Sequence, residues 1–547
     1  MNENIRVLLL TSMSERGVNM TPPIGLHRLR FYLAQRGISC DVVDFAIEDS
    51  DKSLLDVKRG LYHIIGIQVT HFQIITDLEL LWLYKDASRQ CRHNVLMIAG
   101  GQEATMNHKQ WLEVGIDLIG LGFAEKVMYE IASIMATHIT DAGPKAPIDV
   151  GQLFGELNGV AFLDNHGQAV YRPAQHMDED EFRQLNYNQV KKMDIPHLEY
   201  WELVRAQRAD LFVTGERRYT YETVRLYTSS HCPRRCGFCS SQNFFPISLG
   251  QKSPILMLTA SEVFDLIIYH IETYGAKAFL FTDDDFAVGN RSGLERFKNL
   301  CNIIIAGKKS GQIPAELRFI FQARIADFLI RTNDTKKQHE INFELLDLIS
   351  TAGFRNVGLG VETFSENLLF APSINKRVTS KACHDVINAM LKRKMVPQIY
   401  IIIGIPESSC EELVDSMDAA IDYMDKGCDV GMVTQLRAYP GSPLVQNPEY
   451  KIAYKSWQHP DTGKIHKFMD YFIPGDPVMK VVAANIKEEA LVELEKAVSD
   501  NNLDDTTIWP KSLIGVTAFM AAARLLNRMD VYNRYESYLD RSISMTN

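Results

Sequence analysis

Three cysteines lie close together near the middle of the chain and form its most informative motif. Cys232, Cys236 and Cys239 occur in the string Cys-Pro-Arg-Arg-Cys-Gly-Phe-Cys. Three thiolates on one loop are soft ligands that suit zinc or an iron–sulfur cluster. A structural zinc normally needs a fourth ligand, and no other Cys/His pair has the spacing of a second zinc knuckle. A cluster held by three thiolates would leave one iron open for a small molecule.

A repeating strand–helix pattern positions the cysteine loop. The cysteines follow the first of six apolar runs that alternate with helical patterns between residues 222 and 436. The expected strands are 223–228, 278–281, 318–322, 356–361, 399–404 and 430–436. Two of the helices begin with capping boxes, Thr259 with Glu262 and Ser409 with Glu412. Six such units predict a partial βα barrel over residues 216–445, with its chemistry at the carboxyl ends of the strands.

A second α/β region precedes the barrel. Expected strands at 5–11, 41–44, 64–70, 95–99 and 118–121 alternate with helical patterns, which predicts a Rossmann-like domain over residues 1–140. Residues 141–215 are expected to be a connector with a β-hairpin at 159–172. Residues 446–547 hold aromatic loops and then a helical stretch, which predicts a mainly helical C-terminal cap. Trp457, Tyr471 and Phe472 are candidates either for a substrate pocket or for ordinary core packing.

Composition narrows the possible functions. The 547 residues are 46% hydrophobic and 23% charged, as in an ordinary globular protein, and nine cysteines are too few for a disulfide scaffold. The formal net charge of -10 disfavours a broad surface for nucleic acid. No apolar run reaches the roughly 20 residues of a membrane helix. The first residues lead directly into a strand-like run without a visible signal peptide. We therefore expect a soluble cytoplasmic protein with no nucleic-acid partner and no membrane span.

The cysteine spacing and the motifs at the strand ends together resemble the radical S-adenosylmethionine (SAM) superfamily. Besides Cys-x₃-Cys-x-aromatic-Cys, the matching strings are Asp283-Asp284-Asp285-Phe286, Gln322-Ala323-Arg324, Gly360-Val361-Glu362, Gly404-Ile405-Pro406-Glu407 and Tyr439-Pro440-Gly441-Ser442-Pro443. The resemblance implies a [4Fe-4S] cluster on Cys232, Cys236 and Cys239, with the open iron binding the amino and carboxylate groups of SAM. Reductive cleavage of SAM would then give a 5′-deoxyadenosyl radical.

The resemblance also suggests which residues bind SAM. Phe238 would lie near the adenine, and Arg324 and Glu362 are candidates for contacts to the ribose or the methionine end. The Gly404 turn would let the backbone approach the adenine. Asp283 and Gln322 complete the set of candidates. The residue types alone also permit simpler structural roles: Glu362 could cap the following helix, Arg324 could form an ion pair, and the run Asp283–Asp285 could be a solvated turn.

The N-terminal region resembles the cobalamin-binding domain that precedes the barrel in one large subgroup of this superfamily. The matching strings are Pro22-Pro23-Ile24-Gly25-Leu26, Gly100-Gly101-Gln102-Glu103-Ala104-Thr105 and Asp117-Leu118-Ile119-Gly120-Leu121-Gly122. The resemblance assigns Pro23, Gly100, Gly101 and Gly122 to cobalamin. Relatives commonly carry Gly-Glu-Gly-Glu where this chain has Gly122-Phe123-Ala124-Glu125, and no Asp-x-His-x-x-Gly string supplies a lower histidine ligand to cobalt. The alternative is a vestigial domain of the cobalamin-binding type.

These resemblances imply an enzyme, most simply a cobalamin-dependent C-methyltransferase. An unactivated carbon of a small molecule or peptide would receive a methyl group from methylcobalamin, and a second SAM would remethylate the cobalt. The electron donor would be a flavodoxin- or ferredoxin-like protein. The sequence assigns no catalytic acid or base.

Three alternatives compete with methyl transfer. The same architecture could catalyse a rearrangement, cyclisation or oxidation. A methylthiotransferase would need three further N-terminal thiolates, and only Cys40 and Cys91 precede the motif. A redox-sensing module stabilised by zinc or a cluster would leave the strand-end motifs without a use.

Overall fold

The computed structural model describes residues 5–12, 21–208, 222–287, 290–330, 339–501 and 512–546. The chain divides into two compact units. The N-terminal unit comprises Met1–Leu203, Ser240–Pro254 and Lys455–Phe468. The barrel unit comprises Val204–Cys239, Ile255–Tyr454 and Met469–Asn547. In chain order, Cys239 is the last residue of a barrel-unit segment, and Ser240 begins a segment of the N-terminal unit.

A seven-stranded sheet forms the centre of the N-terminal unit, in the order β2-β1-β3-β4-β5-β6-β7. Its strands are β1 (Arg6–Thr11), β2 (Ser39–Asp44), β3 (Ile64–Gln68), β4 (Leu96–Gly100), β5 (Leu118–Gly120), β6 (Val160–Leu163) and β7 (Ala169–Arg172). The first five pair in parallel, as the alternating apolar and helical patterns predict. The hairpin β6–β7 was expected within a connector, but β6 pairs antiparallel with β5 and extends the sheet.

Helices cover both faces of this sheet. They are α1 (Ile24–Ala34), α2 (Ser50–Lys58), α3 (Ile74–Ser88), α4 (Gln102–Met106), α5 (His108–Glu113), α6 (Glu125–Ala142) and α7 (Val150–Phe154). The chain then forms α8 (Glu179–Arg183), α9 (His197–Arg208) and α10 (Ser241–Leu249). Alternate strand residues separate two apolar cores. Leu8, Ile65 and Met97 pack with α2, α3 and α5, whereas Val7, Ile64 and Leu96 pack with α1, α6 and α7. This alternation is the period of a strand buried on both faces.

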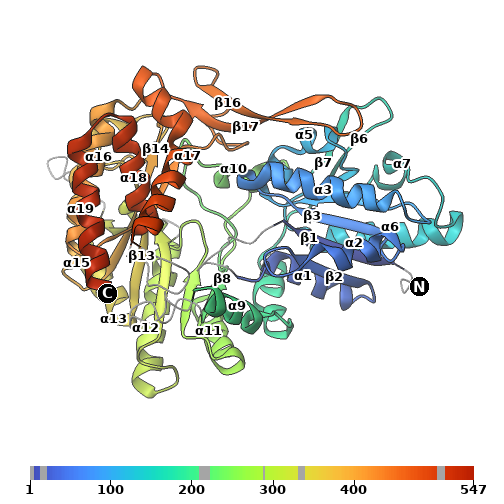
Figure 1. The fold of residues 1–547 in the computed structure, drawn as a ribbon. Coiled ribbons are helices and arrows are strands. Elements are labelled where there is room, and N and C mark those ends of the chain that lie inside the picture. Colours follow the sequence, from blue (N-terminus) through green and yellow to red (C-terminus); the bar gives the residue numbers. More distant parts are fainter. Residues whose placement is uncertain are drawn as a thin grey trace. The chain divides into compact units, whose positions relative to one another are not determined.

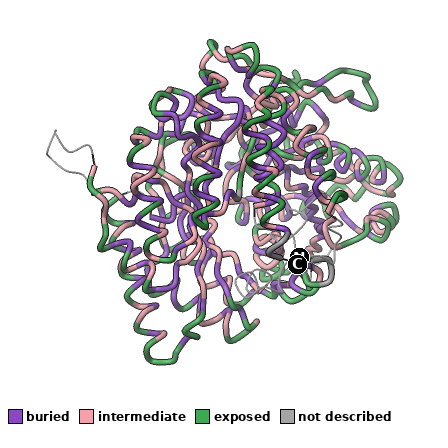
Figure 2. The backbone as a smooth tube through the Cα atoms, turned by 60° about the vertical axis from the view of Figure 1, so that its left-hand side comes forward, coloured by how far each residue is buried: buried purple, intermediate pink, exposed green. Residues whose placement is uncertain are grey.

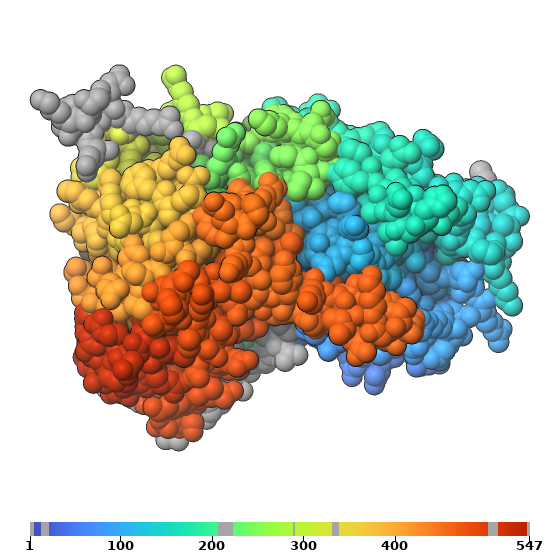
Figure 3. Space-filling view, turned by 90° about the horizontal axis from the view of Figure 1, so that it is seen from above, coloured from blue at the N-terminus to red at the C-terminus, as the bar shows by residue number. Residues whose placement is uncertain are grey.

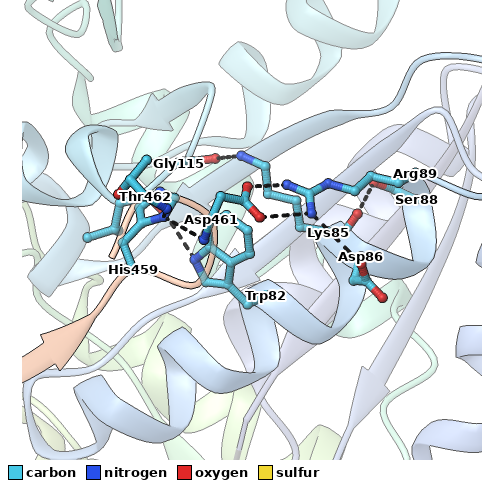
Figure 4. A network of polar contacts seen from close by, with 10 residues as sticks. Trp82, Lys85, Asp86, Ser88, Arg89, Gly115, His459, Asp461 and Thr462 are labelled. Atoms are coloured by element: carbon cyan, nitrogen blue, oxygen red, sulfur yellow. Dashed lines mark hydrogen bonds and ion pairs between the residues drawn. The ribbon is translucent and has the colours of Figure 1, made fainter. Parts of the chain in front are cut away.

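The aromatic stretch after the barrel forms a hairpin of β16 (Lys451–Gln458) and β17 (Ile465–Ile473), where the sequence suggested loops. The tip of this hairpin belongs to the N-terminal unit and packs on α3 (Figure 4). The ring centroid of Trp82 lies 4.6 Å from that of His459 and 6.2 Å from that of Trp457. Arg89 forms an ion pair with Asp461 at the rim of this contact. Trp457 therefore serves in packing at the tip.

Six parallel strands form the sheet of the barrel unit, in the order β15-β14-β13-β10-β9-β8. They are β8 (Thr223–Leu226), β9 (Ala278–Phe281), β10 (Arg318–Ala323), β13 (Phe354–Glu362), β14 (Val396–Ile403) and β15 (Asp429–Gln435), with a small antiparallel pair of β11 (Leu329–Ile330) and β12 (Glu340–Ile341). Neighbours in the sheet follow in chain order, as expected for a partial βα barrel.

The helices between these strands are α11 (Ala260–Tyr274), α12 (Arg291–Ser310), α13 (Phe343–Ala352), α14 (Glu366–Phe370), α15 (Ser380–Leu391) and α16 (Cys410–Asp425). The predicted capping boxes begin α11 and α16. A cluster of buried phenylalanines fills the space between the sheet and α12, among them Phe281, Phe297 and Phe354. Along β10 and β14 the opposite face carries half-buried residues, including Gln322 and Tyr400, so this interior face is less buried. Figure 2 shows the buried, half-buried and exposed segments along the backbone.

The helical C-terminal region is present and consists of α17 (Pro477–Asp500), α18 (Leu513–Leu525) and α19 (Met529–Thr546). These helices pack beside α16 and β15 on the flank of the sheet (Figures 1 and 3). Gly515 of α18 lies so close to β15 that a Cβ there would be 2.4 Å from the carbonyl oxygen of Val430. Tyr535 of α19 donates a hydrogen bond to the carbonyl of Met417 in α16 at 2.6 Å. Within the described residues, no helix combines the length and apolarity needed to cross a membrane.

Candidate functional site

The three cysteines lie on the loop that follows β8, at the carboxyl end of the first barrel strand. Cys236 is buried, and Cys232 and Cys239 are half-buried. Gly237 fixes this loop because its amide donates to the carbonyl of Ile374 at 3.4 Å and its own carbonyl accepts from the amide of Leu444 at 3.0 Å. A Cβ at Gly237 would lie 2.0 Å from the carbonyl oxygen of Pro372. Since backbone cannot move aside easily, only glycine fits between Cys236 and Phe238.

The surroundings of the loop keep the Cys232 thiol protonated as long as no cation binds it. Burial raises the pKa of the Cys232 thiol far above its ordinary value, and the carboxylates of Asp285 and Asp284 raise it further. The backbone amide of Arg234, 3.4 Å from Cys232 Sγ, acts in the opposite direction. Such a thiol loses its proton when a cation binds it, as the thiolate chemistry of iron–sulfur clusters requires. Within the described residues, no three His, Cys, Asp or Glu side chains converge as they would around a single metal ion.

A buried lysine lies beside the cysteine loop and was not found by sequence reasoning. Lys376 Nζ lies 2.7 Å from Glu362 Oε1, and the two side chains are only 6% and 9% exposed. Burial lowers the pKa of Lys376, but Glu362 and Cys236 outweigh this effect and hold it above its ordinary value. The ammonium also lies 5.7 Å from the ring centroid of Phe238. Glu362 therefore pairs with Lys376, and the site holds a fixed positive charge next to a predicted thiolate.

Arg324 and Glu362 belong to this same group. The Arg324 guanidinium donates to the carbonyl of Lys376 at 2.9 Å, and its Nε is buried with no partner among the described residues. Gly360 leaves room for the ion pair, because a Cβ there would lie 2.6 Å from Lys376 Nζ. Gln322 lies on the half-buried interior face of β10. An unsatisfied guanidinium nitrogen beside a buried pair fits a polar ligand.

The acidic run after β9 is mostly buried. Asp283 accepts hydrogen bonds from the amide and hydroxyl of Thr228, both at 2.9 Å, and from Ser229 Oγ at 2.6 Å. Asp285 forms an ion pair, at 3.1 Å, with Arg234, which lies within the cysteine motif. The alternative of a solvated turn is therefore wrong for Asp283 and Asp285, and only Asp284 is exposed. Both buried carboxylates hold the segment that carries the cysteines, and direct contact of Asp283 with SAM stays a prediction.

Gly404 has a packing reason to be glycine. Its φ is +82°, a left-handed conformation that glycine adopts without strain. A Cβ there would lie 3.1 Å from the Cβ of Ala483 in α17. The structure thus accounts for the residue through helix packing, and its contact with adenine stays a prediction.

The residues expected to bind cobalamin lie at the carboxyl edge of the N-terminal sheet. Pro23 precedes α1, Gly100 ends β4 and Gly101 follows it, and Gly122 follows β5. A Cβ at Gly100 would meet nothing within 4 Å, whereas one at Gly101 would lie 3.1 Å from the carbonyl of Val69. Gly122 approaches Ser248 of α10, with a Cβ–Cβ distance of 3.2 Å. The buried hydroxyl of Thr105 has no partner among the described residues. The open side of Gly100 and this hydroxyl fit a ligand at the edge.

Two buried acids at the same edge were not singled out from the sequence. Asp77 accepts from the Thr70 amide at 2.7 Å and from the Ser12 hydroxyl. Burial raises the pKa of Asp77 to about 7, although these two hydrogen bonds act to lower it. Glu103 lies 3.0 Å from His71 Nδ1. An acid within the apolar helical pattern of α3 was the signal that could have revealed Asp77.

Residues 226–420 match the family profile of the Radical SAM superfamily. No curated protein matches this chain in sequence. Among solved structures, the fold resembles the radical S-adenosylmethionine methyltransferase TsrM from Kitasatospora setae. That match has 16% identity and a TM-score of 0.60, and covers 87% of this chain and 88% of TsrM. The cobalamin-dependent SAM radical enzyme OxsB matches at 14% identity with a TM-score of 0.64, over 100% of this chain and 81% of OxsB.

Residues 226–420 therefore form a domain of the Radical SAM superfamily, which indicates an enzyme. The cysteine loop, the Lys376–Glu362 pair and Arg324 all lie within the matched domain. The fold, with a Rossmann-like unit before the barrel, is similar to the folds of TsrM and OxsB. The predictions of superfamily and fold class are thus confirmed. The individual ligand contacts of the radical SAM site stay predictions.

Lys376 shows what the sequence did not reveal in this domain. It lies in the string Ile-Asn-Lys-Arg, which carries no helix, strand or family signal. It reaches the site because the chain after α14 turns through Asn375 and Arg377, both with positive φ. Sequence spacing alone does not predict such a turn.

Proposed function

We propose that this chain is a cobalamin-dependent radical SAM C-methyltransferase. Cys232, Cys236 and Cys239 hold a [4Fe-4S] cluster. Phe238, Asp283, Gln322, Arg324, Glu362 and Gly404 form the SAM site, and Pro23, Gly100, Gly101 and Gly122 form the cobalamin site. The observation that carries the proposal is the clamped cysteine loop at the strand ends of a radical SAM domain, together with a ligand edge left open at Gly100 in the Rossmann-like unit.

When bound, the cluster and SAM supply a 5′-deoxyadenosyl radical, and cobalamin supplies the methyl group. The protein's own residues fix the geometry around these groups. Gly237 holds the thiols in one position, and Lys376 places a positive charge beside Cys236 that offsets the charge of a thiolate. The ion pair with Glu362 keeps this lysine in place.

The interior face of the barrel offers a surface for the substrate. Gln322 and Tyr400 are half-buried there. Burial raises the pKa of Tyr400 to about 12, with Glu362 and Asp429 adding to the effect. At neutral pH its phenol therefore keeps its proton and can donate a hydrogen bond. A small molecule or a peptide carrying an acceptor fits this face.

The proposal includes a cellular setting and partners. An open cluster edge reacts with oxygen, so we place the enzyme in a reducing cytoplasm with a flavodoxin- or ferredoxin-like electron donor. The net charge of -10 supports a substrate other than nucleic acid.

The decisive experiment needs no knowledge of the substrate. Anaerobically purified protein should contain about four irons and one corrinoid. Reduced protein given SAM with a trideuteriated methyl group should form 5′-deoxyadenosine and carry deuterium in its corrinoid fraction. Cys236→Ala should abolish formation of 5′-deoxyadenosine, and Cys410→Ala, a half-buried cysteine of α16, should not. Cleavage of SAM without any methyl transfer to the corrinoid would favour a rearrangement, cyclisation or oxidation.

A further inference from the structure

Two arginines are neighbours in the cysteine motif, and the structure places them in different surroundings. Arg234 and Arg235 lie between Cys232 and Cys236 in the sequence. The side chain of Arg234 is only 17% exposed, whereas Arg235 is exposed to solvent. A charge inside the protein acts on its neighbours more strongly than a charge in water, because the local dielectric constant is lower. The two residues therefore carry the same charge with different reach.

Two buried carboxylates hold the guanidinium of Arg234. Its Nε donates to Asp285 Oδ2 at 3.1 Å, and its Nη2 forms an ion pair with Asp327 Oδ1. The side chains of Asp285 and Asp327 are 0% and 1% exposed. Asp285 follows β9, and Asp327 lies in a short 3-10 helix after β10, Ile325–Phe328. Arg234 therefore ties the cysteine loop to the segments that follow the next two strands of the barrel sheet.

Arg234, Asp285 and Asp327 form a group, the loop triad, in which the acids outnumber the cation. The other oxygen of Asp327 accepts from a neutral donor, the backbone amide of Arg324, at 2.8 Å. Asp285 Oδ1 is buried and has no hydrogen-bond partner among the described residues. The loop triad thus holds one formal positive and two formal negative charges, and the single guanidinium faces both carboxylates.

The backbone of Arg234 contacts the first cysteine. Its amide donates to Cys232 Sγ at 3.4 Å. Hydrogen bonds to the cysteine sulfurs and the net charge nearby are among the features that set the reduction potential of an iron–sulfur cluster. Because the guanidinium is a planar fork, its two ion pairs restrict the position of the residue that carries this amide. The loop triad can therefore act on a cluster through charge and through this hydrogen bond.

The other buried charges near the loop are balanced one to one. Lys376 pairs with Glu362 at 2.7 Å. Asp283 Oδ2 accepts from the hydroxyl of Thr228 at 2.9 Å, and Arg296 donates to the same hydroxyl at 3.0 Å, so these two opposite charges meet at one group. The loop triad differs from both pairs by its excess of negative charge.

We propose that Arg234 is a positioning residue that raises the reduction potential of the cluster, and that the two acids of the loop triad lower this potential while they hold the arginine in place. The inference rests on the proposed function in one respect, that the cysteines hold the cluster. Reduction adds one electron from the external donor, and no bond of the protein forms or breaks. The guanidinium stabilises the added negative charge, whereas each carboxylate destabilises it.

Redox titration of the anaerobically purified protein at pH 8.5 tests this inference, with the electron paramagnetic resonance of the reduced cluster as the readout. Arg234→Met should make reduction about tenfold less favourable, which is a fall of about 59 mV for one electron. Asp327→Asn should shift the potential upward, because it removes one of the two opposing charges. Two variants that merely loosened the loop would not give shifts of opposite sign.

The neighbouring arginine provides a matched control. Arg235→Met removes the same charge one residue later, from an exposed position. Its shift should be several-fold smaller than that of Arg234→Met, because water and salt screen the charge. Arg234→Lys keeps the charge and loses the fork, so its potential should lie between those of the wild type and Arg234→Met.

The pattern of shifts decides the outcome. Shifts of the same sign in Arg234→Met and Asp327→Asn, or equal shifts in Arg234→Met and Arg235→Met, would overturn the proposal. If Arg234→Met does not retain iron, a downward or absent shift in Asp327→Asn overturns it. A wild-type protein without a reducible cluster would contradict the proposed function and this inference together. A wild-type cluster that cleaves SAM but gives the wrong pattern of shifts in the variants would contradict this inference alone.

Discussion

The two large sheets of this molecule differ in how closely their glycines are packed. At the edge of the N-terminal sheet, Gly100 faces open space. In the barrel unit, the room left by Gly237, Gly358 and Gly360 is occupied by protein atoms within 2.7 Å of where a Cβ would lie. Gly100 thus leaves open space at the first edge, whereas the three barrel glycines let protein segments pack closely on one another.

The buried charged groups of the two units also differ in their partners. In the barrel, Lys376 with Glu362 and Arg234 with Asp285 form buried ion pairs around the cysteine loop. At the N-terminal edge, Asp77 is buried against neutral donors from Ser12 and Thr70. The charged groups of the barrel site thus have charged partners within the protein, whereas the acid at the N-terminal edge has neutral ones.

The largest effect should come from glycines of the two regions. Gly237→Ala places a Cβ 2.0 Å from the carbonyl oxygen of Pro372 and should cost more than about 3 kcal/mol, with loss of bound iron. Gly100→Ala meets no atom within 4 Å, so the variant should fold and keep its iron. It should instead lose corrinoid. Thermal unfolding with iron and corrinoid analysis of both variants measures the contrast.

The glycine comparison fails if both variants lose corrinoid and iron together. Gly25→Ala, which also meets no atom within 4 Å, is the matched control that should leave both contents unchanged.

Buried ion pairs should give the next largest effect. Lys376→Met leaves Glu362 buried without its partner and should cost about 3–5 kcal/mol. The double variant with Glu362→Gln should lose less than the sum of the two single changes, because the buried charge is then removed. Both single variants should also reduce iron content, since Lys376 lies beside Cys236.

The buried ion pair of Arg28 and Glu125 in the N-terminal unit provides a control that distinguishes loss of stability from loss of the cluster. Arg28→Met breaks the pair with Glu125 and should destabilise the protein to a similar extent. Its iron content should stay at the wild-type level. Loss of iron in this variant would show that unfolding alone explains the result with Lys376.

Much of the fold could be predicted because the strands are apolar runs closed by recognisable helix starts. The capping boxes of Thr259 and Ser409 are formed as predicted, since four local residues decide them. The β16–β17 hairpin was missed because its strands do not alternate cleanly between polar and apolar residues: three apolar residues follow one another at 452–454 in β16 and at 471–473 in β17.

The candidate site could be predicted only where its residues are close in sequence. The cysteines lie on one loop, so their spacing was sufficient. Lys376 reaches the site from a separate segment, and so does Asp327, which forms an ion pair with Arg234 of the cysteine loop. Nothing in the local sequence marks either residue. Asp283 and Asp285 were ambiguous because an acidic run is the same string whether it is solvated or bonded to Thr228 and Arg234.

A pH dependence should distinguish the N-terminal edge from the barrel. Burial raises the pKa of Asp77 to about 7, against about 3.9 in an unfolded chain. The native state therefore binds the Asp77 proton more tightly than the unfolded chain does. The free energy of unfolding consequently falls as the pH rises from about 4 to about 7. Asp77→Asn should remove this loss and gain about 2–3 kcal/mol on the wild type between pH 5 and 8. Thermal unfolding of the wild type and of Asp77→Asn at pH 5 and pH 8 tests this prediction. A stability difference between the two proteins that does not change with pH would contradict the raised pKa.

The smallest effect should come from the exposed rim of the hairpin tip. Arg89 and Asp461 form an ion pair with both side chains more than two-fifths exposed. Water and salt screen such a pair, so Arg89→Ala should shift the melting temperature by less than about 2 °C, and less still at high salt. Trp82→Ala should have a far larger effect, because the indole is buried under the tip and donates to the carbonyl of Val114 at 3.2 Å. If Arg89→Ala proved as damaging as Trp82→Ala, the tip would be held by charge, and the packing of its aromatic residues would be secondary.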